Sequence, residues 1–210
     1  MQNLTKTELH CHTKMSAGCG LIGPSELVHF AYDNGYKNIA ITDCGNVQAF
    51  PEVYQTWKKL WKGYAEDCAK KNINADREHF LKVIYGMEGT LLGEDGETYP
   101  VLIYAKNQDG IRNLYKIVTE SNLHYSDKTP RIPRSLLEEH RRGLVIGAVC
   151  DEGEILQAIE AGRNDTEVRE RIAFYDFLEV VPCGSWNEHL NKLVLLGKEC
   201  GKLLVAASDA

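Results

Sequence analysis

Two histidines one residue apart, His10 and His12, follow a short strand-like run near the start of the chain, in "TELHCHTK". Side chains of a β-strand alternate between its two faces, so residues i and i+2 point the same way. A strand here would place both imidazoles on one face and Cys11 on the other. One metal ion could then bind both histidines, although two histidines in a polar core would have the same spacing.

Further side chains that can bind a metal follow the strand-like runs along the rest of the chain. They are Asp43, Cys44, Glu88, Cys150, Cys183 and Asp209. In a β/α barrel the carboxyl ends of the strands form one rim, so these groups are expected to converge there. Imidazole, thiolate and carboxylate ligands together suit zinc, manganese or iron. The alternative is that the acidic residues cap helices and the cysteines fill the core.

Seven strand-like runs alternate with helical patterns almost to the end of the chain. The runs cover residues 7–12, 38–43, 81–88, 100–107, 144–150, 177–183 and 203–209. Helical patterns cover 24–35, 51–71, 108–121, 134–142, 153–174 and 185–201, with a break expected near Gly162. This alternation predicts a parallel sheet wrapped by helices, either closed into a barrel or open and doubly wound. Convergence of the metal-binding side chains favours the barrel.

The chain is long enough for one sizeable hydrophobic core, and no linker or repeat divides it, so we predict a single domain over residues 1–210. Residues 61–79 are highly charged and are expected to form an extended helix followed by a surface excursion. The stretch "GEDGET" at 93–98 is expected to be a hairpin turn. It does not predict a phosphate-binding loop, because no helix follows it.

The composition narrows the classes of function. A formal net charge of −6 argues that this domain alone holds DNA only weakly, since that binding depends on Lys and Arg. Seven cysteines at irregular spacing do not predict a disulfide framework, and a reducing cytoplasm is expected. No apolar run reaches the length that crosses a bilayer, so no membrane partner is expected.

Several stretches together carry a family resemblance. They are "ELHCHTKMS", "AITD", "KVIYGMEGTLL", "VLIYAKNQDGIRNLYKIVTESNLHY", "PRIPRSLL", "GLVIGAVCDEGE" and "FYDFLEVVP". They resemble the PHP (polymerase and histidinol phosphatase) domain of bacterial DNA polymerase III alpha subunits of the C type, from about residue 7 to 209. The resemblance implies an α/β fold, a distorted seven-stranded (β/α)7 barrel whose rim binds one to three metal ions. The ancestral reaction that it implies is phosphoester hydrolysis.

The same resemblance assigns His10, His12, Glu88 and Asp209 to one metal position, and all four residues are present. A metal there would lower the pKa of a bound water and supply hydroxide to a phosphorus centre. Glu88 and Asp43 are therefore the candidate catalytic residues. Asp43 would orient a ligand or the water, or would only cap the following helix.

The other two metal positions depart from the family pattern. The second would use Cys150 and a histidine that is replaced here by Pro100. The third position has Cys19 and Cys44 in place of two usual ligands. Its remaining ligand would be a histidine two residues after Asp209, and this sequence ends one residue before that, at Ala210. A thiolate-rich site would favour zinc over manganese. The alternative is that metal binding has decayed at this position.

These departures predict a replicase-derived module that is mainly structural, a metal-stabilised barrel that supports the polymerase and offers a docking surface. The alternative is a working metal-dependent phosphoesterase that acts on phosphate esters or nucleic-acid 3′ ends. The family continues into palm, thumb and fingers, and a proofreading domain usually follows the Glu88 strand, so we expect a fragment of a longer polymerase. Its partners would be the rest of that chain, the replisome and a phosphate-containing ligand.

Overall fold

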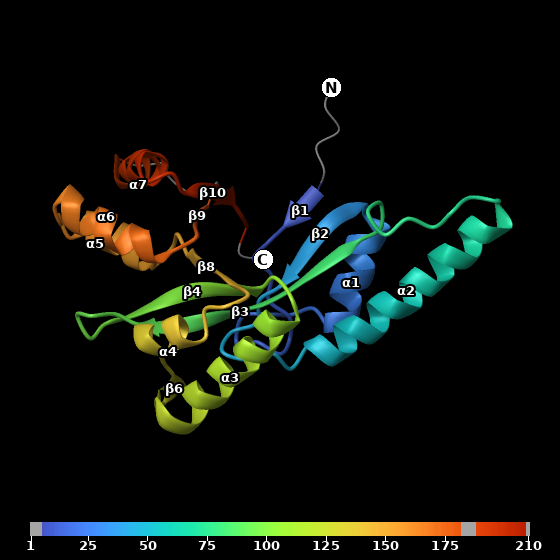
Figure 1. Cartoon of the computed structure of the whole chain (residues 1–210), viewed down its shortest axis with the longest axis horizontal. Helices are drawn as coiled ribbons and strands as arrows, with labels where there is room; N and C mark the ends of the chain where they lie inside the picture. Colours follow the sequence, from blue (N-terminus) through green and yellow to red (C-terminus); the bar gives the residue numbers. More distant parts are fainter. Residues whose placement is uncertain (1–5, 182–187, 209–210) are drawn as a thin grey trace.

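The computed structural model describes residues 6–181 and 188–208, and one curled sheet runs through them (Figure 1). The sheet has the strand order β1-β2-β3-β4-β8-β9-β10. These strands are β1 (Lys6–Glu8), β2 (Tyr36–Ile41), β3 (Lys82–Leu92), β4 (Thr98–Ala105), β8 (Leu144–Ala148), β9 (Phe177–Val180) and β10 (Leu203–Ala206). Each of the seven predicted runs overlaps one of them, and the predicted α/β barrel is confirmed as a curled half-barrel.

Three two-residue strands complete the β-structure of the described residues. β5 (Ser126–Asp127) and β6 (Thr129–Pro130) pair with each other, and β7 (Ile132–Pro133) extends the main sheet beside the end of β3. The pairing of Leu91 with Ile132 places this short strand beyond Glu88, the metal ligand predicted in β3.

Helices pack on the outer face of the sheet (Figure 1). They are α1 (Pro24–Asp33), α2 (Phe50–Lys70), α3 (Gln108–His124), α4 (Arg134–Glu139), α5 (Glu154–Glu160), α6 (Asp165–Phe174) and α7 (Glu188–Glu199). The break expected near Gly162 separates α5 from α6, and Gly162 has a φ of 71°, which favours glycine. No helix in the described part of the chain is long and apolar enough to cross a membrane.

The direction of β4 differs from the prediction. β4 runs antiparallel to both of its neighbours, β3 and β8, whereas the alternation of strands and helices predicted a parallel sheet. The cause is the hairpin turn predicted at 93–98, in which the Gly93 amide donates to the Glu97 carbonyl at 2.9 Å. A turn this short can join only antiparallel strands. Because β3 continues to this turn, Glu88 lies in the middle of its strand and not at its end.

The curl brings the first and last strands together. Glu8, at the end of β1, accepts hydrogen bonds from the amide of Ser208 at 3.3 Å and from its hydroxyl at 2.6 Å. A separate cluster of buried side chains fills the inside of the curl, drawn from the strands and their ends and from no helix. Gly147 leaves room there for the Phe177 ring, because a Cβ at Gly147 would lie 2.0 Å from it.

A buried ion-pair network connects helices α4, α5 and α6 with the β3–β4 hairpin turn. Glu154, at the start of α5, is 2% exposed and accepts hydrogen bonds from Arg134, Arg171 and Tyr175. Arg171 also lies 3.3 Å from Asp95, in the β3–β4 turn. Burial, and then the neighbouring Glu154 carboxylate, raise the pKa of Tyr175 well above its usual value. The phenol therefore stays neutral and donates to Glu154.

Replacing Glu154 with alanine should destabilise the fold strongly. The change leaves the charges of Arg134 and Arg171 without their buried partner, and we expect the free energy of unfolding to fall by about 3 kcal/mol. The matched control is Glu199→Ala, which removes an exposed pair with Arg169 and should cost under about 1 kcal/mol. Urea unfolding measures the free energy of unfolding of both variants. Equal losses would show that the buried network stabilises the fold no more than an exposed ion pair does.

Candidate metal centre

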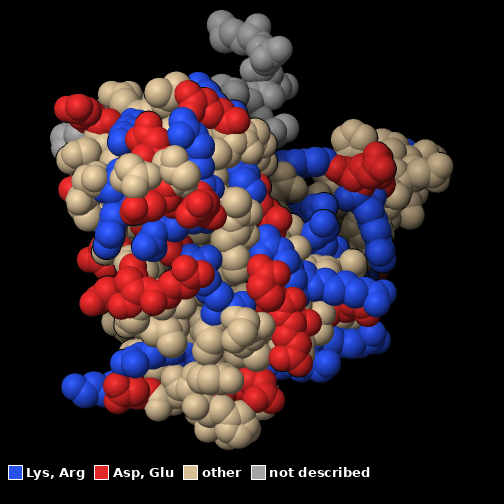
Figure 2. Space-filling model, turned by 60° about the vertical axis from the view of Figure 1, so that its left-hand side comes forward, with Lys and Arg blue, Asp and Glu red and all other residues tan. Residues whose placement is uncertain are grey.

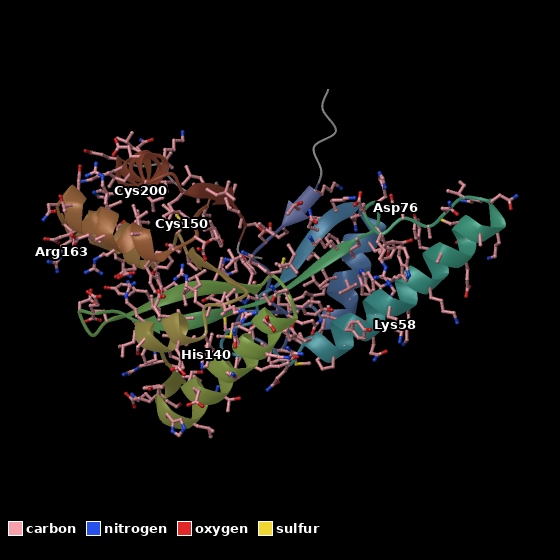
Figure 3. The ribbon with its side chains drawn as sticks, in the orientation of Figure 1. Lys58, Asp76, His140, Cys150, Arg163 and Cys200 are labelled. Atoms are coloured by element: carbon pink, nitrogen blue, oxygen red, sulfur yellow. The ribbon has the colours of Figure 1, made fainter. Side chains whose placement is uncertain are left out.

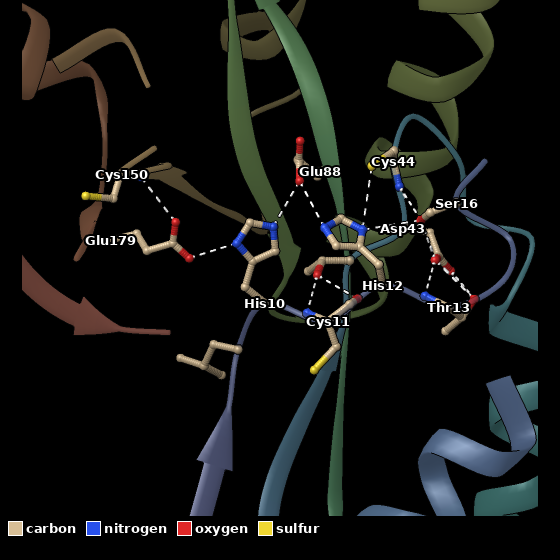
Figure 4. A network of polar contacts seen from close by, with 12 residues as sticks. His10, Cys11, His12, Thr13, Ser16, Asp43, Cys44, Glu88, Cys150 and Glu179 are labelled. Carbon is tan, nitrogen blue, oxygen red and sulfur yellow. Dashed lines mark hydrogen bonds and ion pairs between the residues drawn. The ribbon is translucent and has the colours of Figure 1, made fainter. Parts of the chain in front are cut away.

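Three potential metal ligands meet at one oxygen atom. Nε2 of His10 lies 2.9 Å from Oε2 of Glu88, and Nε2 of His12 lies 3.2 Å from the same oxygen. Figure 4 shows the two imidazoles approaching Glu88 from either side. Within residues 6–181 and 188–208, this is the one group of three or more His, Cys, Asp or Glu side chains with ligand atoms all within 4.8 Å.

The backbone around Cys11 determines the direction of the His10 and His12 imidazoles. β1 ends at Glu8, so both histidines lie just beyond the strand in which we predicted them. Reciprocal hydrogen bonds with Thr42 continue the extended course, since the Cys11 amide donates to Thr42 Oγ1 at 2.9 Å and the Thr42 amide donates to the Cys11 carbonyl at 3.0 Å. Cys11 is buried in the apolar core. The imidazoles therefore share one side of the chain, as the spacing predicted.

The loop that follows β2 fixes the position of Glu88. The Gly45 amide donates to the Glu88 carbonyl at 2.7 Å, and the Glu88 amide donates to the carbonyl of Asp43 at 3.2 Å. Cys44 and Glu88 form an isolated parallel bridge between these hydrogen bonds. The Glu88 carboxylate is thereby held in the middle of β3, opposite the histidines.

Glu179 holds His10 from the opposite side, and the sequence analysis missed it. Oε1 of Glu179 lies 2.8 Å from Nδ1 of His10, and Oε2 accepts from the Cys150 amide at 3.2 Å. Both His10 and Glu179 are almost completely buried. A carboxylate inside the apolar strand run "FLEVV" was the available signal, because such a residue rarely faces a core without a partner.

The contacts of His10 leave a lone pair directed at Glu88. A neutral imidazole carries one N–H group, and its other nitrogen is an acceptor. When Nδ1 donates to Glu179, Nε2 of His10 turns its lone pair toward a negatively charged oxygen of Glu88. That arrangement is unfavourable unless a proton or a cation lies between the two atoms.

Ser16 holds the His12 imidazole as Glu179 holds that of His10, with Nδ1 as the hydrogen-bond donor. The Ser16 hydroxyl donates its single proton to Asp43 at 2.7 Å, so Nδ1 of His12, 3.3 Å from that hydroxyl, is the donor of their hydrogen bond. Nε2 of His12 then also turns a lone pair toward Glu88. Two imidazoles and one carboxylate are a ligand set typical of a transition metal ion, so the residues present fit such an ion.

The electrostatics show that protons would compete with a metal for this cluster. Burial lowers the pKa of His12, but hydrogen bonds with Cys44 and Glu88 outweigh burial and raise it to about 10. For Glu88, burial raises the pKa, but hydrogen bonds with His10 and His12 dominate and lower it to about 2. Without a metal, the cluster is therefore an imidazolium–carboxylate pair.

Asp43 supports the loop that carries the histidines. Its carboxylate is buried and accepts from the Thr13 amide at 2.7 Å, from the Thr13 hydroxyl and from Ser16. It does not cap the following helix, because Ala49 occupies the N-cap of α2. Asp43 thus acts on His12 through Ser16, as a group that positions the ligand loop.

The predicted cysteine ligands lie outside the three-residue cluster. Cys44 Sγ is 3.6 Å from Nδ1 of His12, on the side of the ring away from Glu88. Cys150 is buried, its sulfur is turned away from His10 (Figure 4), and burial raises the pKa of its thiol. Cys19 is exposed. Asp209 and Cys183 lie outside the described residues.

A surface hollow of about 310 Å³ opens beside Glu88. Its lining includes Pro100, Asp151 and Glu152, and no Lys or Arg among the described residues. Pro100 thus stands beside Glu88, at the position where the resemblance led us to expect a histidine ligand. The hollow is accessible to a small molecule, but its charge is negative.

Relatives with similar sequences are named DNA polymerase III PolC-type. The Clostridium perfringens protein is 39% identical over 125 residues, which cover 52% of this chain and 9% of the relative. The Lacticaseibacillus paracasei protein is 34% identical over 224 residues, which cover 85% of this chain and 15% of the relative. The chain therefore spans a small part of the length of these relatives.

Solved structures share the fold at low sequence identity. A protein from Bifidobacterium adolescentis, described as a metal-dependent phosphoesterase, superimposes with a TM-score of 0.62 and 16% identity, covering 98% of this chain and 87% of that one. An amidohydrolase from Chromobacterium violaceum gives a TM-score of 0.54 at 13% identity, with the same coverage. The family model of the PHP domain matches residues 8–179. The chain therefore belongs to the PHP domain family.

Proposed function

We propose that this chain is the metal-binding PHP module of a bacterial replicative DNA polymerase III alpha subunit of the C type. In this proposal its main work is structural, and its phosphoesterase activity is weak or lost. The observation that carries the proposal is the meeting of His10, His12 and Glu88 at one carboxylate oxygen. The relatives named DNA polymerase III PolC-type supply the polymerase context.

The ion would be held by His10, His12 and Glu88, and Asp209 remains the proposed fourth ligand. Zinc is the metal we favour, with manganese or iron as alternatives, because imidazole and carboxylate groups bind all three. Glu179 and Ser16 would hold the two imidazoles with both Nε2 atoms directed toward the ion beside Glu88. The ion would then connect three segments that lie far apart in the sequence, which stabilises the curl of the sheet.

The charge of the hollow supports a structural role over catalysis. Phosphoester hydrolysis requires groups that stabilise the negative charge developing on the phosphoryl oxygens. The hollow beside Glu88 offers Asp151 and Glu152 instead of Lys or Arg, and Pro100 supplies no metal ligand. A bound metal would activate a water molecule here, but the described residues that line the hollow include no Lys or Arg to bind a phosphate.

A docking role is supported by the size of the relatives. The chain matches 9% and 15% of the length of two proteins named DNA polymerase III PolC-type, so the rest of such a polymerase would lie beside this domain.

The second candidate function is a working metal-dependent phosphoesterase. One observation favours it, namely that Glu88 borders a hollow large enough for a small phosphate ester. In this case Glu88 and the metal would activate water, and Asp43 would position the histidine loop.

Changing His12 to alanine should remove the bound metal. We expect the full chain to retain about one equivalent of zinc after loading and dialysis, because three protein ligands form a stable zinc site. The variant loses one of those ligands and should retain almost none. His29→Ala, an exposed histidine on α1, is the matched control. Elemental analysis measures the content, and equal metal in all three proteins would contradict the proposed site.

Metal affinity should rise with pH. In the ion-free protein the pKa of His12 is about 10, so an ion that binds near neutral pH must displace one proton, whereas Glu88, with a pKa of about 2, is already ionised. One displaced proton corresponds to about a tenfold gain in affinity for each pH unit. Calorimetric titration with Mn²⁺ at several pH values below 9 tests this, and an affinity independent of pH would show that His12 is not a ligand.

Hydrolysis should be undetectable or very slow. We expect p-nitrophenyl phosphate with Mn²⁺ or Zn²⁺ to be turned over no faster by the wild-type chain than by the His10→Ala variant, because the hollow lacks groups that stabilise the phosphoryl charge. The release of nitrophenolate measures both rates. Metal-dependent turnover that disappears in the variant would instead establish the phosphoesterase alternative.

A further inference from the structure

Two tryptophans on α2 each border a surface hollow, far along the chain from the metal centre. Trp57 and Trp61 lie one helical turn apart, and their rings are parallel within 4° with centroids 6.2 Å apart. Trp57 borders a hollow of about 590 Å³, and Trp61 borders another of about 640 Å³. Both side chains are partly exposed. The chain therefore presents two aromatic hollows side by side.

Basic residues dominate the rim of the hollow beside Trp57. Lys37, Arg77 and Lys82 border it together with one acidic residue, Glu78. Because Lys82 is the first residue of β3, this hollow lies at the beginning of the strand whose middle carries the metal-binding carboxylate.

The hollow beside Trp61 repeats this composition. Lys58, Lys59 and Lys62 border it with one acidic residue, Glu66. Lys and Arg side chains project from the right-hand side of the molecule in Figure 2, the side on which α2 lies, and Figure 3 labels Lys58 on this helix. Six basic and two acidic side chains thus gather here, in a chain whose net charge is −6.

The aromatic rings are held in fixed positions. The Trp57 indole N–H donates to the carbonyl of Leu81 at 2.7 Å, and Phe80 packs edge-on against both indoles. Arg77 lies over both rings, 5.9 Å from the centroid of Trp57 and 5.3 Å from that of Trp61. Fixed rings with a guanidinium above them are ready to stack on a planar ligand without first losing conformational freedom.

We propose that this face of α2, with its two tryptophan hollows, binds single-stranded nucleic acid. Unpaired bases would stack on the indoles, and the phosphates would contact the lysines and Arg77. A nucleic-acid strand repeats a flat apolar base and a charged phosphate, which matches a repeated aromatic hollow with a basic rim. An acidic peptide would match the rim alone, and duplex DNA would keep its bases paired and out of reach.

The test is fluorescence anisotropy of a labelled dT12 oligonucleotide with the full chain, at low salt and with EDTA present. Lys58→Glu/Lys62→Glu should weaken binding at least about tenfold, because two phosphate contacts become repulsive. The matched control, Lys116→Glu/Lys198→Glu, makes the same charge change on α3 and α7 and should weaken binding less than about threefold.

A second arm tests stacking. Trp61→Ala should weaken binding of dT12 about fivefold or more, provided that its melting temperature shows a folded protein. Should this variant unfold, quenching of the wild-type tryptophan fluorescence by dT12 replaces it, and absence of quenching counts against the proposal. Because EDTA is present throughout, the binding of dT12 in this assay does not depend on an ion at the metal centre.

Four further outcomes would overturn the proposal. They are no binding of dT12 by the wild-type chain, equal weakening by the two double variants, tighter binding of a duplex than of dT12, and equally tight binding of a labelled ten-residue poly-glutamate peptide. The last result would identify an acidic polypeptide as the occupant.

Discussion

The structure depends on one carboxylate oxygen, Oε2 of Glu88, which lies within 3.2 Å of an imidazole nitrogen from His10 and another from His12. Glu88 is more than seventy positions from either histidine in the chain, and both imidazoles are buried. Burying two imidazoles and a carboxylate together is costly unless a proton or a cation balances their charges and lone pairs. The neighbouring polar groups hold the three side chains around this point, where a proton or a cation would balance their charges.

The neighbouring groups determine which atoms are left to bind. Glu179 occupies Nδ1 of His10, and Ser16, oriented by Asp43, occupies Nδ1 of His12. Both Nε2 atoms are thereby directed at Glu88. The same contacts close the fold, because Glu179 comes from β9, Glu88 from β3 and the histidines from the segment after β1. The candidate site and the curl of the sheet are therefore built from one set of interactions.

Most of the fold could be predicted from the sequence, because hydrophobic alternation marks strands and Gly162 marks a helix end. The predicted direction of β4 was wrong, because the alternation of strands and helices indicates a parallel sheet. The hairpin turn at 93–98, which reverses the chain before β4, was predicted correctly. The shared direction of His10 and His12 followed from a spacing of two residues. Glu179 was missed because its partner His10 lies 169 residues away, and the apolar run around it indicates only that its carboxylate needs a partner. The cysteines were predicted as ligands from their place after the strands and from the family resemblance, whereas the direction of a thiol such as that of Cys44 is decided by packing.

The most direct test of the central claim is a crystal structure of the chain grown with zinc, using anomalous scattering at the zinc edge. We expect one strong peak between the three side chains, about 2.0–2.2 Å from Nε2 of His10, from Nε2 of His12 and from an oxygen of Glu88. A well-ordered cluster with no peak, or a peak held by other residues, would contradict the account.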